Sequence, residues 1–402
     1  MNAAPNTRRV VITHALRTPI GRYLGSFKDQ SAADLGTSVV GELVRRAGLD
    51  AGEVGEVVMG NARQAGGGPN VARQIAHRSG LGDLVPAWTM NMACGSGLKA
   101  IECVAAAIAS GRYEVGIAGG TESMSKLPFF LPKMRTGYRL GHAKLVDAMY
   151  EDGFECPLAD MLMGATVEGL AQDLGITRAE QDAFALDSQQ KAGAAIEAGR
   201  FEEEISPVEV PQRKGDPICV SADEHPRPDT SLEKLGKLAA VFDADKGSVS
   251  AGNSSGITDG AAALVLMSAE EAERRGCEVL AVIGESAQAG VDPKRMGIGP
   301  VPAIRALEER NGIGVADYDL VELNEAFAAQ VLACQRELEI PTDRLNVNGG
   351  AIALGHPIGA TGARIVVTLV HEMKRRGATK GLASLCISGG MGLAFAFHRD
   401  AS

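Results

Sequence analysis

The stretch Ala87-Trp88-Thr89-Met90-Asn91-Met92-Ala93-Cys94-Gly95-Ser96-Gly97 joins an apolar run to a turn that contains a cysteine and two glycines. Residues 87–91 have the composition of a strand, and a helical pattern runs from Gly97 to about Ser110. A second apolar run at residues 115–120 predicts a buried strand. A strand, turn, helix and strand in this order are typical of an α/β architecture.

The same alternation continues outward in both directions. Strands are expected at residues 9–13, 56–60, 261–267, 280–283 and 320–323, and helices at 32–49, 268–275 and 302–311. Near the C-terminus, a glycine-rich turn, a helix at 363–376 and an apolar strand at 382–386 loosely repeat the pattern around Cys94. We therefore expect two duplicated mixed-sheet halves whose glycine-rich turns meet around one site.

The middle of the chain has a different character. Between residues 126 and 247 prolines and charged residues accumulate, and only 163–199 is strongly helical. Long loops on a rigid scaffold often carry binding residues. We expect an inserted loop domain at 126–247, an N-terminal half at 1–125 plus 248–275, and a C-terminal half at 276–402.

Composition excludes several classes of function. The chain has 402 residues, a formal net charge of −10 and no basic stripe, so no nucleic-acid partner is expected. It has no run of 18 apolar residues, so no membrane span is predicted. Seven irregularly spaced cysteines and the absence of a secretory pattern predict reduced thiols and a cytoplasmic protein. No metal-ligand spacing appears, so no metal is expected.

Four side chains are candidates for chemistry. Cys94 begins a helix, whose dipole is expected to lower the thiol pKa; the alternative is a small buried apolar residue. His356 lies in a glycine-rich stretch at 348–362 and suits a general base, or a hydrogen-bonded structural role. Cys386 ends an apolar strand and suits either a proton carrier or core packing. Asn324 follows a strand and suits a water-holding residue or a helix N-cap.

Together these motifs resemble those of the thiolase family over nearly the whole chain. The matching stretches are residues 17–21, 91–97, 251–256, 259–262, 324–327, 355–357 and 386–392. The resemblance implies a layered αβαβα fold and a homodimer or homotetramer. It also implies condensation of two acetyl-CoA molecules to acetoacetyl-CoA and the reverse thiolysis, with acyl-CoA as substrate and no permanently bound cofactor.

The resemblance further implies a role for each candidate. Cys94 would hold the acyl group as a thioester, His356 would accept the Cys94 proton, and Cys386 would move a proton to and from acetyl-CoA. A water positioned by Asn324 would form one oxyanion hole together with His356. The backbone N–H groups of Cys94 and Ser388 would form the second.

Residues expected to contact CoA lie mainly in the inserted region. Arg227 would bind the nucleotide end, and Phe242 and Ser255 would line the adenine and pantetheine path. The alternatives are a solvated arginine, a core phenylalanine and a turn serine. Leu162, before Met163, replaces a histidine that short-chain members carry, so the acyl chain length stays open.

Other readings of the same residues remain. A broader 3-ketoacyl-CoA thiolase of fatty-acid degradation is the nearest alternative. A ketoacyl synthase usually pairs its cysteine with two histidines, whereas Asn324 and Cys386 take the partner positions here. A cysteine hydrolase would not need Cys386, and a non-catalytic acyl-CoA or lipid binding protein would need neither cysteine. Ser388 also replaces a usual glycine, so its turn must fit a Cβ.

Overall fold

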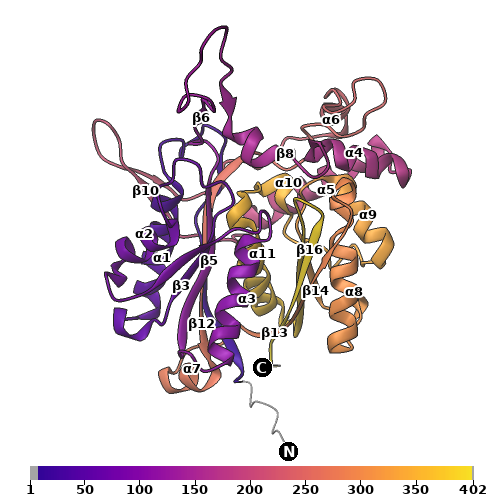
Figure 1. The fold of residues 1–402 in the computed structure, drawn as a ribbon. Helices are drawn as coiled ribbons and strands as arrows, with labels where there is room; N and C mark the ends of the chain where they lie inside the picture. The colour runs from indigo at the N-terminus through magenta and orange to yellow at the C-terminus, as the bar shows by residue number, and fades with distance from the viewer. Residues whose placement is uncertain (1–7, 401–402) are drawn as a thin grey trace, which may run out of the picture.

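The computed structural model describes residues 8–400 and contains one large mixed sheet with helices on both sides and through the middle (Figure 1). The first and last residues of the expected domains, 1–7 and 401–402, lie outside the described part. The strands of the sheet, in spatial order, are β14 (Leu320–Leu323), β15 (Lys380–Ile387), β16 (Met391–His398), β13 (Ala281–Gly290), β1 (Val10–Arg17), β12 (Thr258–Ser268), β5 (Val115–Ser123), β3 (Val57–Gly60) and β4 (Ala87–Met90). A short strand β2 (Gly21–Arg22) pairs with β12.

The sheet consists of two sets of strands with the same pairing pattern. In one set β12 is antiparallel to β1 and β5, and β5 is parallel to β3. In the other, β16 is antiparallel to β13 and β15, and β15 is parallel to β14. The two sets join through only two residue pairs, Val11 with Val282 and Ile12 with Ala281. The predicted α/β fold with a large mixed sheet is confirmed, and the repeated pattern supports the proposed duplication.

Helices form three layers around these strands (Figure 1). The outer helices are α1 (Ala32–Ala47), α2 (Val71–Ala76) and α7 (Ala269–Arg275) on the N-terminal set, and α8 (Pro300–Asn311) and α9 (Ala328–Leu338) on the C-terminal set. Between the two sets run α3 (Ser96–Ala109) and α11 (Ile358–Arg376), next to a short α10 (Ala351–Leu354). One apolar cluster joins Ile101 and Val104 of α3 to Ile365 and Leu369 of α11.

The two central helices approach each other closely because glycines face the contact. A Cβ on Gly97 would lie 2.7 Å from the backbone nitrogen of Ala363, and one on Gly362 would lie 2.3 Å from that of Leu98. No side chain fits at either position without separating the helices. The chain segments that begin these helices, around Cys94 and His356, are thereby held next to each other.

The inserted segment leaves the sheet after β5 and returns at β12. Its ends are neighbours, because Ser123 pairs with Asp259. Its elements are β6 (Phe129–Phe130), β7 (Val146–Asp147), a helical turn at Tyr150–Phe154, β8 (Glu155–Cys156), β9 (Met161–Leu162), α4 (Met163–Asp173), α5 (Arg178–Glu197), β10 (Val208–Val210), β11 (Ile218–Val220) and α6 (Leu232–Gly236). In the C-terminal set, β15 and β16 are joined directly by a short turn. This contrast supports the proposal that residues 126–247 are an insertion.

Several elements differ from the expectation. β16 and α9 were not predicted, and α11 begins at Ile358 instead of residue 363. Pro357 is the N-cap and marks this early start. Proline is favoured where a helix begins, because its φ is fixed near the helical value and its missing N–H removes no hydrogen bond within the helix. Among the described residues, no helix is long and apolar enough to cross a membrane.

Candidate active site

A cavity of about 640 Å³ opens where both glycine-rich turns and the inserted segment meet. Nine of the side chains predicted for the site line it: Cys94, Leu162, Met163, Arg227, Phe242, Ser255, His356, Cys386 and Ser388. The structure therefore brings together residues that are up to 294 positions apart in the chain, as Cys94 and Ser388 are. The remaining candidate, Asn324, does not line the cavity.

The turn that carries Cys94 is held in an unusual conformation. Ala93 has a φ of 46°, in the left-handed region that residues with a Cβ rarely adopt. The Ser96 hydroxyl accepts a hydrogen bond from the Met92 N–H at 2.8 Å and donates one to the Ala93 carbonyl at 2.7 Å. The Asn91 side chain accepts from the Ala93 N–H at 3.0 Å. These bonds fix the strained turn and direct the Cys94 side chain into the cavity.

The thiol of Cys94 has a raised pKa, which corrects the expectation of a lowered one. Burial is the largest influence and raises it, while Arg63 and the backbone N–H groups of Ser388 and of Cys94 itself lower it. Desolvation of the sulfur thus exceeds the stabilisation of the thiolate. Those two N–H groups are the pair expected to form an oxyanion hole, and both act on the Cys94 sulfur.

His356 reaches the cavity from a turn that requires a glycine. Gly355 has a φ of 106°, and a Cβ there would lie 2.6 Å from the side chain of Thr258. Nδ1 of His356 lies 2.6 Å from Oγ1 of Thr361, whose hydroxyl donates to the Pro357 carbonyl at 3.0 Å. We assign Nδ1 as the donor from this network, which leaves Nε2 with a free lone pair.

Burial and the neighbouring charges keep the His356 imidazole neutral. Desolvation, with smaller contributions from Arg63 and Arg364, lowers the pKa of His356 to about 3. A neutral imidazole with Nε2 unprotonated is the form that can accept a proton from a thiol.

Cys386 stands at the end of β15 with only 1% of its surface exposed. Burial, and the nearby Cys94 and Cys334, raise the pKa of Cys386 well above the usual thiol value. In the turn that follows, Gly389 and Gly390 have φ of 87° and 84°, whereas Ser388 is not among the residues with positive φ. The turn therefore accommodates the Ser388 Cβ without strain.

Asn324 is buried behind the cavity with 1% of its surface exposed. Its backbone N–H donates to the Ser384 carbonyl at 2.9 Å, but Nδ2 and Oδ1 have no partner among the described residues. The alternative N-cap role is wrong, because α9 begins at Ala328 and its N-cap is Phe327. A buried amide with both polar atoms unpaired is suited to a bound water.

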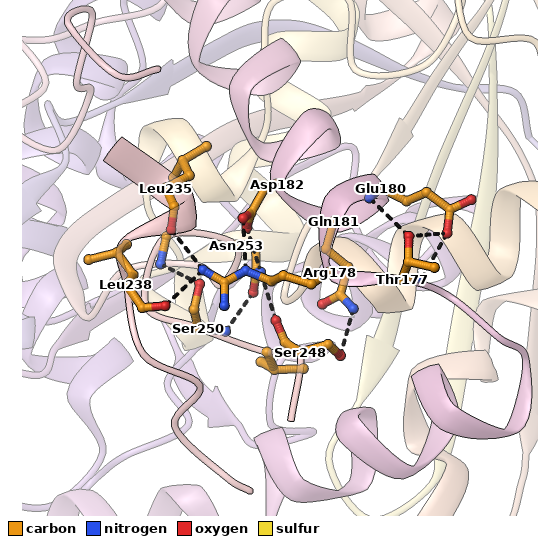
Figure 2. A network of polar contacts seen from close by, with 12 residues as sticks. Thr177, Arg178, Glu180, Gln181, Asp182, Leu235, Leu238, Ser248, Ser250 and Asn253 are labelled. Carbon is orange, nitrogen blue, oxygen red and sulfur yellow. Dashed lines mark hydrogen bonds and ion pairs between the residues drawn. The ribbon is translucent and has the colours of Figure 1, made fainter. Parts of the chain in front are cut away.

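The segment that carries the expected CoA contacts is attached to α5 by the polar network in Figure 2. Arg178 donates to Asp182 at 2.8 Å and to the carbonyls of Leu235 and Leu238 at 2.7 and 2.9 Å. Asp182 also accepts from the Asn253 side chain at 2.9 Å. These bonds fix residues 235–253 on both sides of Phe242 and place Ser255 just beyond the last of them.

Part of the cavity wall comes from the start of α4. Leu162 ends β9 and Met163 begins α4, and both line the cavity. Phe242 packs over Gly164 so closely that a Cβ there would lie 1.9 Å from the ring. The wall is apolar at this point.

Arg63 and Glu122 are two charged residues at the site that the sequence interpretation did not single out. Arg63 lines the cavity although only 5% of its surface is exposed. Beneath it the buried Glu122 carboxylate accepts from the Asn61 side chain at 2.7 Å and from the Gly359 N–H at 2.8 Å. This carboxylate ties the Arg63 segment to the start of α11. The only signal in the sequence was a charged residue just after an apolar strand.

The cavity is lined by two thiols, those of Cys94 and Cys386. All seven cysteines fall in the described residues and are free. Within residues 8–400 there is no group of three or more side chains arranged to hold a metal ion.

Comparison with known proteins identifies the family. The chain matches the family models "Thiolase, N-terminal domain" over residues 10–270 and "Thiolase, C-terminal domain" over 277–399. It is 55% identical to an acetyl-CoA acetyltransferase of Pseudomonas aeruginosa, over 97% of this chain and 99% of that one. It is 50% identical to a probable acetyl-CoA acyltransferase of Staphylococcus epidermidis, over 96% and 98% of the two chains.

A solved structure shows the same architecture. The crystal structure of the Bacillus anthracis acetyl-CoA acetyltransferase superposes with a TM-score of 0.96 at 46% identity, covering 98% of this chain and 100% of that one. The motifs, the duplicated sheet pattern and these matches agree with one another, and the chain belongs to the thiolase family.

Proposed function

We propose that the protein is an acyltransferase that condenses two acetyl-CoA molecules to acetoacetyl-CoA and CoA, and catalyses the reverse thiolysis. One observation supports this most directly: Cys94, His356 and Cys386 line one cavity, and the Ser388 N–H acts on the Cys94 sulfur. A nucleophile, a base and a second thiol are the groups that a two-step acyl transfer needs.

In thiolysis, His356 takes the proton of Cys94 as the sulfur attacks the 3-keto carbon. The N–H groups of Cys94 and Ser388 stabilise the oxyanion that forms there. The bond between C2 and C3 then breaks, and the departing acetyl-CoA enolate takes the proton of Cys386. The acyl group remains on Cys94 as a thioester.

The second step returns every group to its first state. The thiol of CoA gives its proton to the Cys386 thiolate, and the CoA sulfur attacks the acyl group on Cys94. Cys94 leaves and recovers its proton from His356. The raised pKa of Cys386 supports its role, because a thiol of low acidity returns readily to its protonated form and its thiolate is a strong base.

The enolate requires a separate oxyanion site. We assign it to His356 and to a water held by Asn324, whose unpaired amide lies behind the cavity wall. This division between two donor sets is useful because the two anions develop at different carbon atoms.

Acetoacetyl-CoA is the proposed substrate because relatives of high identity are named for acetyl-CoA. A broader 3-ketoacyl-CoA thiolase of fatty-acid metabolism is the second candidate. Leu162 and Met163 favour it, since both line the cavity and contribute an apolar wall.

We further propose a cytoplasmic homodimer or homotetramer. Seven free cysteines fit a reducing compartment. Phe129, Leu140 and Leu145 have 62%, 93% and 69% of their surfaces exposed on a segment that projects from the body near β6 (Figure 1). Exposed apolar side chains grouped on one projection support contact with another copy.

The test is CoA-dependent thiolysis of 3-ketoacyl-CoA substrates from four to twelve carbons. We expect wild-type turnover of acetoacetyl-CoA and no turnover by Cys94→Ala. A Cys386→Ser variant should turn over at least about 100-fold more slowly, because the departing enolate no longer has a thiol to protonate it. Unchanged turnover by Cys94→Ala would refute the proposal.

A further inference from the structure

The proposed chemistry gives no role to Arg63, although its side chain lines the same cavity as Cys94. The residue follows β3, and its backbone N–H donates to the Glu122 carboxylate at 3.2 Å. Only 5% of its surface is exposed. A permanent positive charge therefore lines the cavity close enough to Cys94 to act on its thiol.

Among the described residues, no carboxylate forms an ion pair with the Arg63 guanidinium. Nε and Nη2 are buried and have no hydrogen-bond partner among the described residues. Glu122 and Asp152 act on Arg63 electrostatically, but in residues 8–400 neither carboxylate accepts a hydrogen bond from its Nε or Nη2. Buried arginines are normally paired, because an isolated charge away from water is costly. An unpaired one that lines a cavity points to a ligand that supplies the missing acceptor.

The surroundings hold this guanidinium in a defined place. A Cβ on Gly153 would lie within 2.4 Å of Nη2, Nε and Cζ, so the absence of a side chain there makes room for the group. Its Cζ lies 5.1 Å from the centre of the Phe154 ring, a cation–π distance. A rigidly held planar guanidinium recognises carboxylates in preference to neutral groups.

We propose that Arg63 is a specificity-determining residue that binds a carboxylate at the far end of the acyl chain, so that the enzyme accepts 3-ketoacyl-CoA substrates with a terminal carboxylate. The apolar neighbours Met124 and Leu162 line the same cavity and suit the methylene groups between the two ends. This inference rests on the proposed thiolase function and specifies its substrate class.

The experiment compares charged and neutral substrates of equal length. Thiolysis is measured with 3-oxoadipyl-CoA against 3-oxohexanoyl-CoA, and with 3-oxosuberyl-CoA against 3-oxooctanoyl-CoA. Arg63→Met keeps the length of the side chain and removes its charge, and Arg63→Lys keeps the charge and loses the planar fork. The ratio of kcat/KM for the charged and neutral members of a pair cancels any general loss of folding or activity.

We expect the wild type to prefer the carboxylate substrate of at least one pair, and Arg63→Met to lower that ratio about 10- to 100-fold, the usual effect of a charge-assisted hydrogen bond. Arg63→Lys should lie between them. A wild type that prefers the neutral substrate in both pairs refutes the inference without using a variant. An unchanged ratio in Arg63→Met also refutes it. Failure of the thiolase proposal would instead appear as no turnover of any substrate, acetoacetyl-CoA included.

Discussion

Oγ1 of Thr361 lies 2.6 Å from Nδ1 of His356, one turn into the helix that follows the catalytic candidate. The threonine hydroxyl gives its proton to the Pro357 carbonyl, so it can only accept from the imidazole. This relationship selects the tautomer whose Nε2 can act as a base.

Replacing Thr361 by Val should therefore reduce catalysis through His356. Without the acceptor, the imidazole is no longer held in one tautomer and orientation, and we expect kcat for acetoacetyl-CoA thiolysis to fall about 10- to 100-fold. Thr361→Ser keeps the hydroxyl and should retain most of the activity. A loss in Thr361→Ser as large as that in Thr361→Val would contradict this role, because serine keeps the hydroxyl that accepts from Nδ1.

The resting enzyme should contain a neutral Cys94 thiol and a neutral imidazole. Burial raises the pKa of Cys94, and the pKa of His356 is lowered to about 3. Alkylation requires the thiolate, so its rate at Cys94 should rise about 10-fold per pH unit from pH 7 to 8.5 without a plateau. Peptide mass spectrometry at each pH measures this rate, and a plateau near pH 7 would contradict a raised pKa.

Gly164→Ala should weaken CoA binding by moving Phe242. The new Cβ would lie 1.9 Å from the ring, which must rotate or shift into the cavity. We expect KM for CoA to rise about 10-fold, since the ring lines the proposed CoA path. Gly169→Ala on the same helix is the matched control, because nothing lies within 4 Å of its Cβ position. That variant should leave KM unchanged.

Arg17 should be the most costly arginine to replace. Its Nε donates to Glu204 at 2.6 Å and its Nη1 and Nη2 donate to Asp223 at 2.7 and 2.9 Å, with 1% of the side chain exposed. Arg17→Met leaves two buried carboxylates unpaired, so we expect the free energy of unfolding to fall by about 3–5 kcal/mol. Urea denaturation measures the loss. Arg45→Met, at an exposed helix pair with Glu42, should leave the midpoint unchanged.

Local patterns were sufficient to predict much of the fold. The glycine-rich turns, the apolar strands and the caps are encoded by adjacent residues: Ser268 accepts from the Glu271 N–H and starts α7 as expected. β16 was missed although it lies in the core. All six residues of its interior, 392–397, are buried, so it lacks the polar alternation that marks a strand with one exposed face.

The site was predictable where residue type alone suggests chemistry, as for Cys94 and His356. The sign of the Cys94 pKa shift was not, because it depends on how completely distant segments bury the sulfur. Arg63 was missed for a related reason. Its environment is made by Gly153 and Phe154, about 90 residues away in the chain, and nothing in the neighbouring sequence marks it as buried.

The inserted segment begins and ends at neighbouring positions of the sheet, where Ser123 pairs with Asp259. Both anchor points stay fixed by β5 and β12 whatever lies between them. A different insert with the same two attachment points can thus be grafted onto this scaffold without disturbing the strands that hold the two turns. Such chimeras offer a route to new acyl-CoA selectivities. They would keep the turns that carry Cys94 and His356 and exchange only the inserted segment.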